Sequence, residues 1–139
     1  MISAAGIDAE SQVTFVAVPV TAISLQVQRA LDATNGIVTD VGSVKAVVTR
    51  TITDPRFIGG HPMAGSELEG LDGADGELFT GAVWVLTPTP TTSDAAFATV
   101  ANIVNDLGAE VVGLDPVRHD ELVAIVSHVP HLTAATLMG

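Results

Sequence analysis

The chain has 139 residues, 47% hydrophobic and 15% charged, which is enough apolar material to bury the core of one domain. Its formal net charge of −11 argues against nucleic acids and anionic membrane surfaces as partners, and the absence of cysteine excludes disulfides and thiolate metal sites. The N-terminus lacks a signal-peptide pattern and the most apolar window, residues 13–25, is too short to cross a bilayer, so we expect a cytoplasmic protein.

The first half of the chain alternates strand and helix patterns. Residues 11–18 predict a buried strand that ends at Pro19, and residues 21–33 carry apolar side chains at helical spacing before Asn35-Gly36 stops the helix. The pattern continues with a strand at 37–39, a short helix at 44–51 and a strand at 57–59, and His61 follows directly.

The second half repeats this alternation. We expect a loop with one helical turn at 67–80, a strand at 82–87, a helix capped by Ser93 or Asp94 and ended by Gly108, and a strand at 110–114. Asp115-Pro116 gives an N-cap followed by proline at the first helical position, which predicts a last helix towards Met138 that Pro130 interrupts.

Such alternation predicts an α/β fold with a largely parallel sheet. Ligands of these sheets bind beyond the carboxyl ends of the strands. The predicted strands end near Pro19, Gly42 and His61, so we expect these three positions to share one crevice.

His61 is the strongest catalytic candidate. An imidazole titrates near neutral pH and can accept a proton or hold a hydrogen bond. Gly59, Gly60 and Gly65 leave little side-chain bulk around it, so a substrate can approach closely. The ordinary alternative is a histidine that satisfies loop carbonyls, and the setting among glycines favours the functional interpretation.

Ser43 follows a glycine at a strand-to-helix turn. Its hydroxyl can cap the helix that begins at Val44, and it can also hydrogen-bond His61 or a cofactor in the same crevice. Lys45 is either a solvated helix residue, which we favour slightly, or a phosphate contact.

The other histidines allow a metal-site hypothesis that the spacing does not favour. His128 and His131 are three residues apart, hence on one face of a helix, but they match no HExxH-type signature. We interpret them as a pair that faces substrate, or as one such histidine with the other packed. His119-Asp120 are interpreted as residues that suit the positive start of their own helix. The acidic run at 67–77 is interpreted as a solvated loop.

Three segments in order resemble the prephenate dehydrogenase family of tyrosine biosynthesis. They are DVGSVK at 40–45, FIGGHPMAGSE at 57–67 and HDELVAIVSHVPH at 119–131. The resemblance extends over nearly the whole chain and implies an NAD- or NADP-dependent oxidation of prephenate with loss of carbon dioxide, giving 4-hydroxyphenylpyruvate.

The resemblance also implies roles for single residues. His61 would polarise or deprotonate the ring hydroxyl of prephenate, and Ser43 would orient His61 beside the nicotinamide. The remaining residues would bind substrate (Glu67, Ser127, His128 and His131) or border the cofactor (Val18, Pro19, Val41, Gly42 and Ser43).

The resemblance implies the second half of a Rossmann-like domain at 1–114 and the start of a helical dimerisation domain at 115–139. The sequence contains no GxGxxG turn for the cofactor pyrophosphate, so we expect an incomplete cofactor site, little activity of the chain alone and a homodimer in the full-length enzyme. Arogenate dehydrogenase, a non-catalytic remnant that binds a small anion, and a metal-binding module remain open as alternatives.

Overall fold

The computed structural model describes residues 8–63 and 79–125, which form one five-stranded sheet covered by helices on both faces. Glu67, Ser127, His128, His131, Pro130 and most of the 67–80 loop lie outside the described residues. The elements in chain order are β1 (Val13–Val16), the 3₁₀ turn η2 (Val20–Ala22), α1 (Ile23–Ala33), β2 (Ile37–Asp40), α2 (Ala46–Thr51), β3 (Phe57–Met63), β4 (Val83–Thr87), α3 (Asp94–Asp106) and β5 (Glu110–Gly113). Residues 116–125 are helical as well.

The strands lie in the order β1-β2-β3-β4-β5. Three of the four pairings are parallel, and the exception is the antiparallel pair of β3 and β4. This arrangement confirms the α/β class with a largely parallel sheet. It also means that β4 and β5 run opposite to β1, β2 and β3, so only the first three strands end at the same edge.

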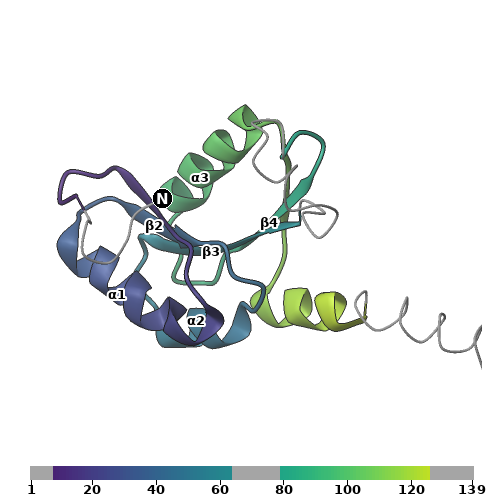
Figure 1. Cartoon of the computed structure of the whole chain (residues 1–139), viewed down its shortest axis with the longest axis horizontal. Helices are drawn as coiled ribbons and strands as arrows, with labels where there is room; N and C mark the ends of the chain where they lie inside the picture. The colour runs from purple at the N-terminus through teal and green to yellow at the C-terminus, as the bar shows by residue number, and fades with distance from the viewer. Residues whose placement is uncertain (1–7, 64–78, 126–139) are drawn as a thin grey trace, which may run out of the picture.

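Two apolar cores lie on the two faces of the sheet. Helices α1 and α2 cover one face and α3 covers the other (Figure 1). The change of face is visible on β3, because Phe57 packs into the core under α1 and α2 while Ile58 packs into the core under α3. No helix of the described ranges is both long and apolar enough to cross a membrane.

Local sequence patterns predicted the ends of several helices correctly. Ser93 Oγ accepts a hydrogen bond from Ala96 N (3.1 Å) at the start of α3, and Gly108 has a φ of +89° just after its end. Asp115 Oδ2 accepts from the backbone N–H of Val117 (3.0 Å) and Arg118 (3.1 Å), so the predicted cap of the last helix is confirmed.

The prediction for β3 was wrong at its end. The strand continues to Met63, and His61 lies inside it opposite Val85 of β4, not beyond it. Pairing with β2 involves only Phe57 and Ile58, and pairing with β4 begins at Gly59. Among the described strands, β3 pairs only with β4 at Pro62. The missing N–H of this proline is therefore tolerated there.

Candidate functional site

The candidate site lies at the edge where β1 and β2 end and β3 continues. Val41 N donates to Val16 O (3.2 Å), which holds the segments after β1 and β2 side by side. Ile58 is the last β3 residue paired with β2. His61 comes three residues later, so it lies inside β3 but beyond the end of β2. The structure thus brings the predicted crevice residues to one edge.

Beneath this edge lies a buried polar cluster of Asp40, Lys45 and Gly60. The Lys45 ammonium donates to Asp40 and to the Gly60 carbonyl oxygen (2.6 Å), and both side chains of the ion pair are fully buried. Asp40 also accepts from the backbone N–H of Gly42 (3.0 Å) and Gly60 (3.2 Å). The cluster ties β2, the turn before α2 and β3 together directly under His61.

Burial shifts both charged members of this cluster. It raises the pKa of Asp40 and lowers the pKa of Lys45, while the attraction between the two opposes both shifts. Breaking such a pair by removing one partner leaves the other buried without compensation, which typically costs about 3–5 kcal/mol. The cluster therefore holds the strand that carries His61 in one position.

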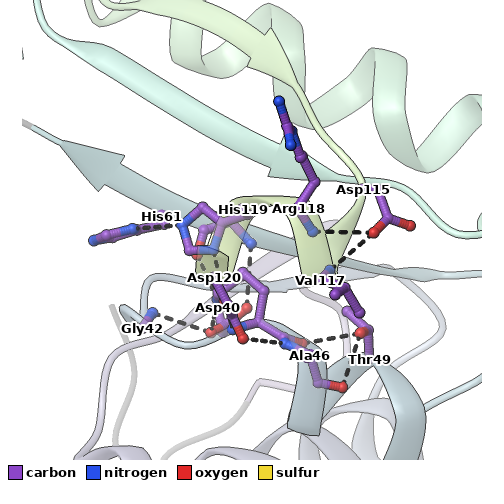
Figure 2. Close-up of polar contacts among 12 residues, drawn as sticks. Asp40, Gly42, Ala46, Thr49, His61, Asp115, Val117, Arg118, His119 and Asp120 are labelled. Carbon is purple, nitrogen blue, oxygen red and sulfur yellow. Dashed lines mark hydrogen bonds and ion pairs between the residues drawn. The ribbon is translucent and has the colours of Figure 1, made fainter. Parts of the chain in front are cut away.

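His61 pairs with a second histidine from a distant part of the chain. Its Nδ1 lies 2.9 Å from Nε2 of His119, and the two rings meet edge to face at 82°. His119 is 1% exposed, and its Nδ1 lies 2.7 Å from Oδ1 of Asp120. Figure 2 shows the resulting row of three side chains.

Asp120 in turn is held by the start of α2. Its Oδ1 accepts from Lys45 N (2.8 Å) and its Oδ2 from Ala46 N (3.0 Å). Burial alone would raise the pKa of Asp120, but these backbone hydrogen bonds and the contact with His119 outweigh it and lower the pKa. Asp120 is therefore an ionised carboxylate at neutral pH.

The surroundings keep His61 uncharged. Burial, followed by the proximity of His119 and Lys45, lowers the pKa of His61 to about 4, and the charge of Asp120 opposes this only in part. A neutral imidazole at pH 7 has one nitrogen that can accept a proton.

Three interpretations from the sequence were wrong. Ser43 is exposed and does not cap α2, which begins at Ala46 with Lys45 at its N-cap position and no side-chain cap from within the segment. Among the described residues, His61 is hydrogen-bonded by His119 and not by Ser43. Lys45 is buried, not solvated. His119 and Asp120 serve His61 and the start of α2, whereas Asp115 caps their own helix.

A signal for the role of His119 was present in the sequence. His119 precedes Leu122 and Val123 by three and four residues, so a titratable residue lies in line with apolar side chains of this helix. A buried polar group needs a partner, but the sequence does not say which one. Within residues 8–63 and 79–125, no group of three or more His, Asp or Glu side chains is arranged to hold a metal ion.

The edge suits an uncharged ring better than a phosphate. Val18, Pro19, Val41 and Gly42 follow β1 and β2 and carry no charge. A hollow of about 280 Å³ beside them is lined only by uncharged residues, namely Val20, Thr21, Ile23, Ser24, Val44, Val47 and Val48. The ammonium of Lys45, below this edge, is already paired with Asp40 and does not offer its charge to a phosphate. An uncharged ring could pack against these residues.

The chain is similar to known dehydrogenases. A family model described as prephenate dehydrogenase, nucleotide-binding domain, matches residues 4–113. Prephenate dehydrogenase of Bacillus subtilis is 36% identical over 107 residues, which cover 73% of this chain and 29% of that protein.

Two solved structures extend the similarity to the fold. Prephenate dehydrogenase from Aquifex aeolicus, solved with hydroxyphenyl propionate and NAD+, superposes with a TM-score of 0.80 at 30% identity and covers 93% of this chain and 47% of that one. Synechocystis arogenate dehydrogenase gives a TM-score of 0.76 at 34% identity, covering 92% and 48%. The chain thus spans less than half the length of these relatives.

Proposed function

We propose, because this chain belongs to the prephenate dehydrogenase family through its nucleotide-binding domain, that it supplies the proton-accepting histidine for an NAD- or NADP-dependent oxidation of prephenate. The observation that carries the proposal is the charge and the hydrogen bonding of His61. It is a neutral imidazole at the edge where β1 and β2 end, with Nδ1 hydrogen-bonded to His119. Among the described residues Nε2 has no partner, so it can face a ligand.

The role of His61 follows from its chemistry. Nε2 would accept the proton of the ring hydroxyl of prephenate as the carbon that bears this hydroxyl is oxidised. Loss of carbon dioxide from the ring then gives the aromatic product, 4-hydroxyphenylpyruvate. The buried cluster of Asp40, Lys45 and Gly60 would keep β3 from shifting during this step.

The cofactor would lie against the uncharged edge, bordered by Val18, Pro19, Val41, Gly42 and Ser43. When bound, the nicotinamide supplies the oxidising group that accepts hydride. Ser43 is exposed and does not cap α2, and its hydroxyl would hydrogen-bond such a ligand. Substrate contacts by Glu67, Ser127, His128 and His131, and a homodimer of the full-length enzyme, belong to the same proposal.

The test is a steady-state assay of the native protein that contains these residues, with prephenate or arogenate and with NAD or NADP. We expect oxidation of prephenate and a loss of kcat of roughly 10²- to 10⁴-fold in His61→Asn, because asparagine keeps a polar side chain but cannot act as a base. Faster turnover of arogenate would instead assign the arogenate reaction. Unchanged kcat in His61→Asn would remove His61 from the mechanism.

A further inference from the structure

We propose that His119 and Asp120 are positioning residues that fix the tautomer of His61, so that Nδ1 carries its proton and Nε2 is left unprotonated towards the substrate. This inference rests on the proposed function of His61 and deepens it. It assigns a role to two residues on the last described helix, 58 and 59 positions further along the chain.

The protonation state of Asp120 is fixed by its hydrogen-bond partners. Its two carboxylate oxygens accept hydrogen bonds from the backbone N–H groups of Lys45 (2.8 Å) and Ala46 (3.0 Å). Backbone N–H groups are obligatory donors, so both contacts favour the ionised carboxylate. An ionised carboxylate has no proton to donate, so Asp120 can only accept a hydrogen bond from His119.

The tautomers of both histidines follow from this. His119 Nδ1 lies 2.7 Å from Asp120 Oδ1 and must donate its proton there. In a neutral His119, Nε2 is then the acceptor, and His61 Nδ1 at 2.9 Å must donate to it. The remaining nitrogen of His61, Nε2, keeps its lone pair, which is the state a general base needs.

The same row stabilises His61 after it accepts a proton. When the substrate hydroxyl gives its proton to Nε2, His61 becomes an imidazolium whose Nδ1–H still donates to His119. Lys45 opposes this positive charge, whereas Asp120 favours it. Asp40 is engaged by Lys45, so among the described residues Asp120 is the carboxylate that acts on His61. No proton needs to reach Asp120, since its role is orientation and charge stabilisation.

Burial indicates that the row is more than a surface contact. His119 is 1% exposed, and a buried polar ring without partners is costly. A purely structural pair would satisfy this requirement with either tautomer, however. The tautomer of His61 therefore separates the two interpretations, and it can be measured without turnover.

The first experiment is ¹⁵N NMR of the imidazole nitrogens in the histidine-labelled chain, with His61 assigned through His61→Asn. We expect His61 to carry its proton on Nδ1. In Asp120→Ala, His119 loses the acceptor of its Nδ1–H. His119 can then donate from Nε2 instead, and we expect part of His61 to carry its proton on Nε2. A wild-type His61 protonated on Nε2 would overturn the proposal.

The second experiment compares turnover in a matched series of the native protein. Asp120→Ala should lower kcat by roughly 10-fold or more while KM stays within a few-fold, because the carboxylate that orients the base is lost and substrate binding is not. His119→Gln offers one donor and one acceptor and should retain more activity than His119→Leu. Arg118→Gln, an exposed neighbour whose side chain points away from His61 (Figure 2), is the control and should match the wild type.

The two proposals fail in different ways. If the tautomer is as expected but prephenate is not oxidised, the positioning role stands and the proposed function falls. If prephenate is oxidised and Asp120→Ala changes neither the tautomer nor kcat, the positioning role falls. Because the wild-type tautomer decides on its own, a misfolded His119→Leu variant leaves the test intact.

Discussion

At the scale of single residues, the charge of His61 is decided by neighbours that are far from it in sequence. Burial, His119 and Lys45 all disfavour the imidazolium, and together they lower the pKa of His61 to about 4. A pKa this far below neutrality makes the free residue a weak base. Prephenate carries two carboxylates, and bound negative charge raises the pKa of a nearby histidine. In the proposed reaction, bound prephenate would therefore raise the pKa of His61 and make it a stronger base.

This gives a prediction for the pH dependence of the reaction. As pH falls, kcat/KM should stay level through pH 6.5 and decline only on approach to about 4, because it reports the free enzyme. The acid limb of kcat should lie at higher pH, since it reports the complex with the anionic substrate. Initial rates with freshly diluted prephenate would show this, with a separate titration of prephenate as the control. A decline of kcat/KM centred near 6.5 would contradict the low pKa.

At the scale of elements, β3 is held more tightly than a surface strand at the residues just before His61. A Cβ added to Gly60 would lie 2.8 Å from the Asp40 carbonyl oxygen and 3.1 Å from both Thr39 Oγ1 and Trp84 Nε1. The glycine is thus required by close approach of β2 and β4, and not by a left-handed backbone. The helix at 116–125 adds a further tie, because Asp120 reaches the start of α2.

We therefore expect Gly60→Ala to destabilise the fold by roughly 1–3 kcal/mol, since the backbone oxygen it meets cannot move aside. Gly113→Ala is the matched control in β5. Its Cβ would meet only the Phe97 ring at 3.8 Å, and it should be neutral or slightly stabilising. Urea unfolding of both variants measures the difference. Equal stabilities of the two would show that the strands at Gly60 can separate at little cost.

At the scale of the whole molecule, the site links folding to pH. The folded state holds the pKa of His61 at about 4, whereas an unfolded histidine titrates near its ordinary value of 6.5. Between these two values the unfolded chain binds a proton that the folded chain does not. The contribution is fully present above about pH 6.5, and it is lost as pH falls from there to about 4.

The corresponding prediction concerns the wild type and His61→Asn, a variant of similar size that does not titrate. The free energy of unfolding of the wild type should fall relative to that of the variant between pH 6.5 and pH 4, since each pKa unit is equivalent to about 1.4 kcal/mol. Urea midpoints at four pH values across this range measure the effect. Parallel pH dependences of the two proteins would show that His61 is not held neutral by the fold.

Much of the fold could be predicted from local patterns. The Ser93 cap, Gly108 and the Asp115-Pro116 start each depend on residues within one helical turn, and the structure confirms them. The end of β3 could not, because its extension to Met63 depends on pairing with β4, which lies about twenty residues downstream. The burial of Lys45 likewise depends on Asp40 and Gly60 meeting over it.

The sequence by itself determined the α/β class, the family resemblance and His61 as the candidate base among glycines. Only the tertiary structure decided what surrounds His61. The contact between His61 and His119 spans 58 positions, and the contact between Asp120 and Lys45 spans 75. No local pattern encodes such pairings, because they arise only when the sheet and the last helix pack together. The sequence therefore indicates the candidate base, and the packing decides which groups surround it.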